Sequence, residues 1–110
     1  MNNLLCITQG NTECPVFKLH ARGQPITASD VKKVEFAFES EAVVKTYPEA
    51  ASFDSENGAF RVPLSQTDTF ALTVGESSYQ IRIYFNDNSV KATPPLPMLV
   101  NPAISKVVLS

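Results

Sequence analysis

The sequence predicts an all-β protein, built as a sandwich or a barrel of short strands. Apolar and polar residues alternate along several short stretches, with the period of two that a half-buried strand requires. Clusters of Gly, Asn and Asp separate these stretches, as turns require. The chain has 110 residues, of which 44% are hydrophobic, enough for one core that needs no metal or disulfide. We therefore expect a single domain over residues 1–110.

Three stretches show the clearest alternation. Val34–Glu39 alternates apolar residues with Glu and Ala, and Phe60–Leu64 and Tyr79–Phe85 repeat the pattern. In the last of these, the odd-numbered residues are expected to point inward. Pro63 has no amide hydrogen for a ladder, so its strand is expected at a sheet edge or with Pro63 at an unpaired position. Weaker patterns predict further strands at Leu4–Thr8, Pro15–His20, Val43–Tyr47, Ser89–Thr93 and Ile104–Leu109.

Two segments predict single helical turns between strands. Thr27–Asp30 and Ser65–Asp68 each pair a hydroxyl residue with an acid three positions later, the spacing of a capping box. After the second turn, Phe70 or Leu72 is expected to close one end of the core. The proline-rich Thr93–Pro97 cannot form a central strand and is expected to be an extended connector into the last strand.

The stretch Ile7–Thr12 leaves two topologies open. Gly10-Asn11 lacks the further glycines, the lysine and the following helix of a phosphate-binding loop. As a tight hairpin turn, the preferred interpretation, it brings Cys6 opposite Cys14 or Pro15. As a kink in an edge strand that passes between sheets, it separates the two cysteines by about 26 Å along the extended strand. Both cysteines are expected to be small buried thiols, with a disulfide as the alternative.

Charge and composition exclude several functions. Nine Lys/Arg and eleven Asp/Glu residues give a net charge of −2 and are scattered along the chain, so the clustered basic face that nucleic acid requires is missing. Residues 1–10 contain neither a basic segment nor a long apolar one, which predicts no secretion signal and no membrane span. Two cysteines and one histidine are too few for a zinc site.

Few residues are candidates for catalysis. His20 is the one imidazole, and it lies at the outward phase or the end of a predicted strand. Glu39 and Glu41 could act as paired carboxylates, but an exposed strand end favours solvated charge. We expect no enzyme activity, and we assign no catalytic, cofactor-binding or metal-binding residue.

Two other groups could hold a ligand. The clustered oxygens of Asp54–Gly58 and Asn86–Asn88 suit calcium, but both segments lie between predicted strands, where these residues serve the turn itself. Tyr47 and Tyr84 are candidate exposed aromatic residues for a sugar, although the chain has no Trp. A carbohydrate-binding module that recognises a bacterial surface glycan is therefore the alternative function.

Six segments carry a resemblance to a known group of proteins. They resemble, in this order, small structural proteins of unassigned function from phages and prophages of Firmicutes. More distantly, the layout is similar to the immunoglobulin-like N-terminal domain of phage baseplate upper proteins. The segments are ITQGNT (7–12), PITASDVKKVEFAF (25–38), KTY (45–47), PLSQTDTFAL (63–72), QIRIYFNDNSVKAT (80–93) and SKVVLS (105–110).

The resemblance implies an immunoglobulin-like β-sandwich of about seven to eight short antiparallel strands with one or two single-turn helices. It further implies a noncatalytic module of a phage tail or baseplate that contacts other structural proteins or its own copies, with no nucleic acid and no membrane as partner. The expected location is the bacterial cytoplasm during assembly and then the virion. No partner-binding residue is assigned, but β-augmentation at an exposed edge is the expected mechanism, with Val43–Tyr47 and Phe60–Leu64 as the candidate edges.

Overall fold

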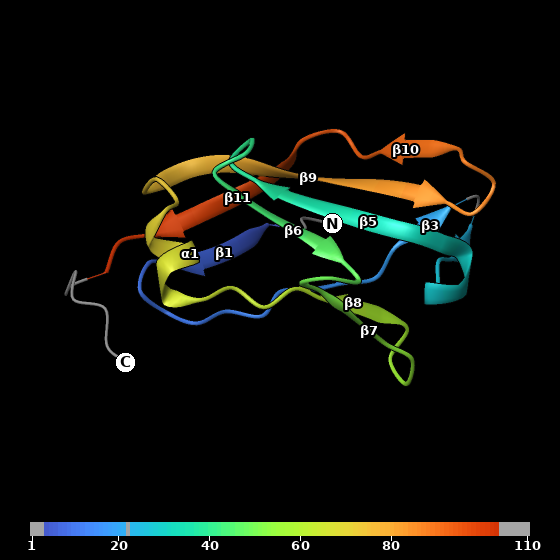
Figure 1. Cartoon of the computed structure of the whole chain (residues 1–110). Helices are drawn as coiled ribbons and strands as arrows, with labels where there is room; N and C mark the ends of the chain where they lie inside the picture. The colour runs from blue at the N-terminus through green and yellow to red at the C-terminus, as the bar shows by residue number, and fades with distance from the viewer. Residues whose placement is uncertain (1–3, 22, 104–110) are drawn as a thin grey trace.

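The computed structural model describes residues 4–21 and 23–103, which form two facing sheets. Figure 1 shows the larger sheet above the smaller one. The larger sheet consists of β1 (Leu5–Thr8), β11 (Leu96–Asn101), β9 (Gly75–Phe85), β5 (Val31–Phe38) and β6 (Val43–Tyr47), in that order, with β10 (Val90–Ala92) also paired to β9. The smaller sheet consists of β2 (Val16–Phe17), β8 (Ala59–Arg61) and β7 (Ser52–Asp54), and a separate hairpin of β3 (His20–Ala21) and β4 (Gln24–Pro25).

One continuous core lies between the sheets, and aromatic rings join its two halves. The ring of Phe36 on β5 lies 5.3 Å from that of Phe17 on β2 and 6.3 Å from that of Phe60 on β8, measured between centroids. Tyr79 on β9 lies 5.5 Å from Phe17. Aromatic pairs at these separations add to the stabilisation that burial itself provides. The predicted all-β, immunoglobulin-like sandwich is therefore confirmed.

The alternation of apolar and polar residues in the sequence correctly predicts which side chains of the longest strands face the core. On β5, Val34, Phe36 and Phe38 are buried, and on β9 Ile81 and Ile83 are buried while their neighbours are less so. Predicted strand Val43–Tyr47 matches β6 residue for residue. The predicted strand Ile104–Leu109 lies outside the described residues.

Gly10 is a crossing point between the sheets, so the preferred hairpin interpretation is wrong. β1 pairs with β11 in parallel, with Cys6 opposite Leu99, whereas Glu13 bridges to Leu64 on the side of the smaller sheet. The φ angle of Gly10 is +85°, which glycine adopts at little cost. The alternative, a kink between sheets, is what the structure contains. The parallel pair also departs from the all-antiparallel prediction.

The prediction that both cysteines are buried is wrong. Cys6 and Cys14 are both free and both exposed, rather than buried. Cys6 lies on the outer face of β1, since its neighbour Ile7 points into the core. The two thiols belong to segments on different sheets, because the chain crosses between them at Gly10.

Two predictions about proline-containing strands need correction. Phe60–Leu64 is not an edge: β8 lies between β2 and β7. Pro63 does occupy an unpaired position, because the amides of Val62 and Leu64 on either side of it donate to Pro15 and Glu13. Leu96–Pro97 belongs to β11 rather than to a connector. Proline is tolerated there because β1 pairs with β11 only from Met98 onward.

The strands are also more numerous than predicted. Eleven are present in the described residues. The predicted strand Pro15–His20 divides into β2 and β3, and β4, β7 and β11 lie in segments where no strand was expected.

Both predicted helical turns are present with their capping boxes. η1 (Ala28–Asp30) follows Thr27, whose amide donates to Asp30 Oδ2 at 2.9 Å. α1 (Gln66–Phe70) follows Ser65, whose amide donates to Asp68 Oδ2 at 2.8 Å and whose hydroxyl accepts from the Asp68 amide at 3.1 Å. Beyond α1, Leu72 is 1% exposed and closes the core, as expected.

Candidate functional site

The candidate site is an open cleft on one lateral side of the sandwich, between the smaller sheet and the β9 side of the larger one. It contains a cavity of about 730 Å³. Apolar core residues form its floor, and the residues on its rims include Leu4, Val16 and Lys18. We call this feature the lateral cleft; its floor is Phe17, Leu19, Tyr79, Ile81 and Ile83.

The core is less completely covered at the lateral cleft than elsewhere. Phe17 and Leu19 keep 9% and 8% of their surface exposed, whereas Phe38 and Phe60 in the middle of the sandwich keep none. Val16 on the rim is half exposed, at 50%. The opening therefore exposes the edge of the apolar core to solvent.

One rim of the lateral cleft is a strand edge with free backbone groups. The carbonyl of Pro15 accepts from Val62, and the carbonyl of Leu19 accepts from Ile26, so these groups face their own strands. Because backbone groups alternate in direction along an extended strand, those of Val16 and Lys18 face the open side. No strand among the described residues pairs with this edge, since β2 ends the order of its sheet.

The opposite rim is the last part of the chain that pairs with β9. Figure 1 shows β10 and β11 following one another along β9. β1 covers β11 only from Met98 onward, so Leu96 and β10 have β9 as their one strand neighbour among the described residues. The lateral cleft is thus bordered by two incompletely paired edges.

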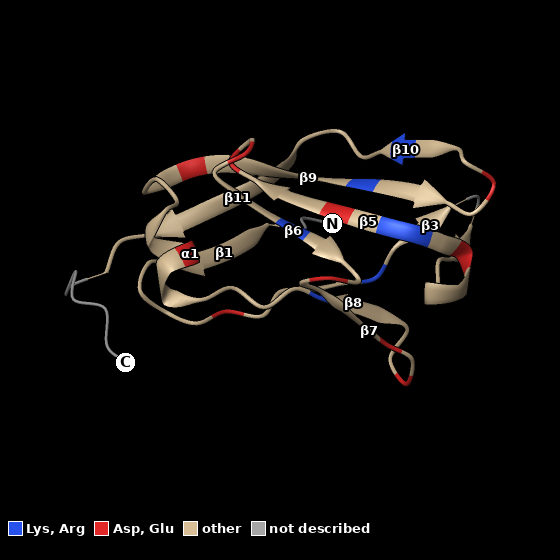
Figure 2. Cartoon of the chain, viewed as in Figure 1, with Lys and Arg blue, Asp and Glu red and all other residues tan. Residues whose placement is uncertain are grey.

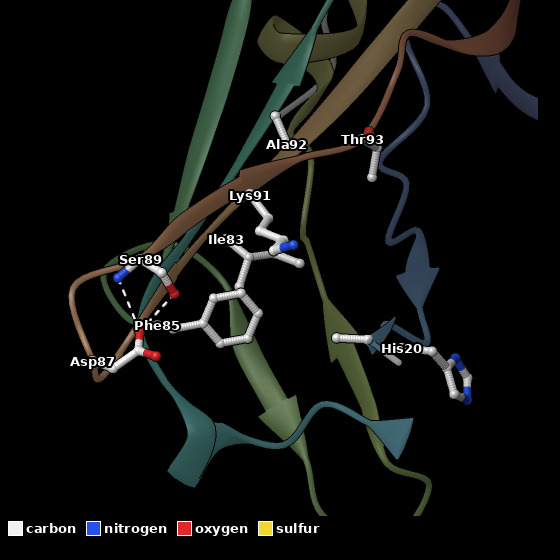
Figure 3. A pocket seen from close by; sticks show the side chains of 9 residues that line it. His20, Ile83, Phe85, Asp87, Ser89, Lys91, Ala92 and Thr93 are labelled. Carbon is white, nitrogen blue, oxygen red and sulfur yellow. Dashed lines mark hydrogen bonds between the residues drawn. The ribbon is translucent and has the colours of Figure 1, made fainter. Parts of the chain in front are cut away.

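A second, more polar cavity of about 410 Å³ adjoins the lateral cleft, with His20, Ile83 and Thr93 in both linings. Figure 3 shows Phe85 and Lys91 at its centre, with the ring of His20 turned away from them. Asp87 accepts from the amide and the hydroxyl of Ser89 and so holds the turn at the far end. An apolar segment in the lateral cleft would meet charged groups at this end.

The other lateral side of the sandwich is bridged by charge. Lys45 on β6 forms a salt bridge of 2.9 Å with Asp68 on α1. Burial acts to raise the pKa of Asp68, but hydrogen bonds from Lys45 and Ser65 outweigh it and hold that pKa below its usual value. The salt bridge therefore ties α1 to β6.

The predicted catalytic candidates do not come together. His20 is exposed on β3 and forms no hydrogen bond with another described residue. Glu39 accepts from the amide and the hydroxyl of Thr73, both at 2.7 Å, and so ties the turn after β5 to the segment after α1. Glu41 is exposed in the same turn. Within residues 4–21 and 23–103, no three metal-ligating side chains gather at one point.

The oxygen-rich segments are turns, as predicted. Asp54 Oδ1 accepts from the amides of Glu56 and Asn57 at 3.1 and 3.4 Å. The hydrogen bond from the Asn57 side chain is the main cause that lowers the pKa of the Asp54 carboxyl. These contacts use the carboxylate oxygens within the loop itself.

The two candidate tyrosines lie on opposite faces of the larger sheet. Tyr47 points inward and packs edge-on against Phe60, with centroids 5.3 Å apart. Tyr84 points outward, and the Lys33 ammonium lies 4.5 Å from its ring centroid. The two rings therefore form no common platform for a sugar.

Charges of both signs are interspersed over the molecule. Figure 2 shows blue and red residues distributed over the strands and turns of the molecule. Among the described residues, no helix approaches the length and apolar character needed to cross a bilayer.

Comparison with known proteins supports the fold. No protein-family model and no curated protein matches the chain. The chain is similar to a solved structure described as "Structures of Clostridium thermocellum CbhA fibronectin(III)-like modules", with 14% identity and a TM-score of 0.52. The match covers 93% of this chain but 43% of the other, so the chain spans less than half of the protein it resembles. At this identity the likeness concerns the β-sandwich fold.

Sequence reasoning missed the lateral cleft. The available signal was Val16, an apolar residue at the outward phase of a predicted strand. Whether such a residue borders an open edge depends on which strands lie beside it, and that depends on the course of the chain after Gly10.

Proposed function

We propose that this protein is a noncatalytic binding module that takes up an extended segment of a partner protein along the lateral cleft. The segment would pair with the free edge at Val16 and Lys18 and direct alternate side chains onto the apolar floor. In β-augmentation of this kind, main-chain hydrogen bonds supply affinity and side-chain pockets supply specificity. The observation that carries the proposal is the coincidence of an unpaired strand edge with an opening of the core.

Within this proposal the partners are structural proteins of a phage or prophage. The resemblance of the chain to small Firmicutes phage proteins supports a tail or baseplate setting. Immunogold labelling of purified particles with an antibody to this chain is expected to mark the tail. Particles without label at the tail would contradict the setting while leaving the binding mode open to its own test.

The binding mode is tested by selecting random extended peptides on the full chain. We expect selected peptides to alternate apolar and polar residues and to bind at least about tenfold more weakly to Val16→Arg, a loss of roughly 1.4 kcal/mol. Val44→Arg is the matched control, because Val44 is also an exposed valine on an edge strand, 42% exposed on β6. It should bind the peptides as the native chain does.

Equal loss of binding in both variants, or loss in Val44→Arg alone, would contradict the proposal. So would a failure to select any peptide together with binding of a bacterial glycan, which would favour the carbohydrate-binding alternative.

A further inference from the structure

We propose that the segment that fills the lateral cleft is Ile104–Leu109 of a second copy of this chain. The inference rests on the proposed function, because it names the occupant of the same cleft. Three observations lead to it: where the described chain ends, how far the following residues can reach, and the pattern of their side chains.

The described chain ends at the end of the sandwich away from the lateral cleft. Ala103 lies beside Gly10 and Phe70, since a Cβ built on Gly10 would lie 3.6 Å from Ala103 Cβ and 3.0 Å from Phe70 Cζ. Figure 1 shows the chain leaving the sandwich beside α1, with β3 at the opposite end. On the larger sheet, the lining of the lateral cleft begins at Leu5, which lies opposite Met98, and then includes Leu96, seven residues back along the chain from Ala103.

This distance prevents Ile104–Leu109 from filling the lateral cleft of its own chain. The strand from Leu96 to Ala103 covers about 23 Å, and six further residues cover about 20 Å when fully extended. Those six residues would be used up in returning past Leu5 to about the level of Leu96, and none would lie along Leu19 and Ile83, which are farther from Ala103. A second copy has no such restriction.

The sequence of the segment suits the lateral cleft. Val107 and Leu109 fall on one face of an extended strand and Ile104 and Val108 on the other. Either face offers two apolar side chains to the floor, and the backbone of the segment offers partners for the backbone groups of Val16 and Lys18, with which no strand among the described residues pairs. β-Branched residues and leucine are also suited to a half-buried strand.

The contact joins two copies through two different surfaces: the C-terminal segment of one copy and the lateral cleft of the next. An interface of this heterologous kind propagates from copy to copy until it closes into a ring or continues as a filament. Each copy gives one segment and accepts one. The native chain is therefore expected to form oligomers whose size depends on concentration.

Two variants separate the giving surface from the accepting one. Val16→Arg places a long charged side chain on the rim, at the edge where the segment would pair, and leaves the segment intact. The double variant Val107→Asp/Val108→Asp places a charge on each face of the segment and leaves the lateral cleft intact. Each variant alone is expected to be monomeric in light scattering coupled to gel filtration. An equimolar mixture is expected to form a complex of two chains and no larger species, because only one productive contact remains. Val44→Arg should assemble as the native chain does.

Each result has a defined consequence. A native chain that stays monomeric at every concentration overturns the inference, and so does a Val16→Arg chain that still forms oligomers, or a mixture that forms no complex. If the chain is monomeric but selected peptides still bind in a manner sensitive to Val16→Arg, the proposed function stands and the named occupant is wrong. If neither assembly nor peptide binding occurs, both fail. Far-ultraviolet circular dichroism of each variant confirms that loss of binding is not loss of folding.

Discussion

At the scale of single residues, Gly10 and Thr69 determine how the chain changes sheets. The amide of Gly10 donates to Thr69 Oγ1 at 2.9 Å, and that hydroxyl donates to the carbonyl of Asn11, also at 2.9 Å. Gln9 adds a hydrogen bond of 2.8 Å from its side chain to the carbonyl of Leu72. The stretch Ile7–Thr12 is thus a junction between the two sheets that is fixed to α1 and to the segment that follows it.

Replacing Gly10 by alanine should destabilise the protein for two separable reasons. Its φ of +85° costs an L-residue about 1–2 kcal/mol, and contact with Phe70 adds roughly 1–3 kcal/mol of overpacking. Gly58→Ala is the control, because Gly58 has φ +63° with no atom within 4 Å of the added Cβ. Urea denaturation should give a clearly larger loss for Gly10→Ala. Equal losses would show that Phe70 moves aside freely.

Thr69→Val should also be costly although it preserves shape. Thr69 is fully buried, and losing its hydroxyl leaves the Gly10 amide and the Asn11 carbonyl without that partner, at about 1–3 kcal/mol. Thr67→Val, at an exposed position of the same helix, should change the free energy of unfolding little. Comparable effects of the two substitutions would contradict a bridging role for Thr69.

At the scale of elements, α1 is linked to β6 by the Lys45–Asp68 salt bridge, and this makes stability depend on pH. The pKa of Asp68 is lowered in the folded protein, so its contribution is complete above the unfolded value and is lost as pH falls through the folded one.

Asp68→Asn should therefore lower the free energy of unfolding by about 1 kcal/mol at neutral pH and by progressively less in acid, until the two proteins converge. Denaturation curves measured from neutral to acidic pH test this. Asp30→Asn, which alters the capping box of η1 without a salt bridge among the described residues, is the control. A difference between native and Asp68→Asn protein that persists unchanged in strong acid would contradict the assignment.

Strands and helical turns that are marked by a pattern within their own residues could be predicted from the sequence. The pairing and order of strands that are far apart in the chain could not. Alternation identified β5, β6 and β9, and cap spacing identified η1 and α1. The position of β8 between two strands, and the parallel pairing of β1 with β11, depend on contacts between residues far apart in the chain. Exposure of Cys6 and Cys14 follows from that pairing, so it was mispredicted together with the turn.

At the scale of the whole molecule, the sandwich is closed unequally at its two lateral sides. Among the described residues, both sides have unpaired strand edges, β6 and β7 on one side and β2 on the other. The first side is bridged by Lys45 and Asp68, whereas at the lateral cleft the unpaired edge lies beside an opening of the core. An uncovered strand edge beside an open core invites pairing with another chain. This asymmetry is the physical basis of the proposed function, and it appears only when the two sheets are assembled.

Hydrogen exchange at the backbone amides of Val16 and Lys18 tests the central claim most directly. In the free chain, held dilute, these amides face the open side and should exchange rapidly. In the complex with the tightest peptide selected on the native chain, both should become strongly protected, while the amide of Val44 on the edge strand β6 remains unchanged. Protection that appears at Val44, or that leaves Val16 and Lys18 as exposed as before, would contradict the account.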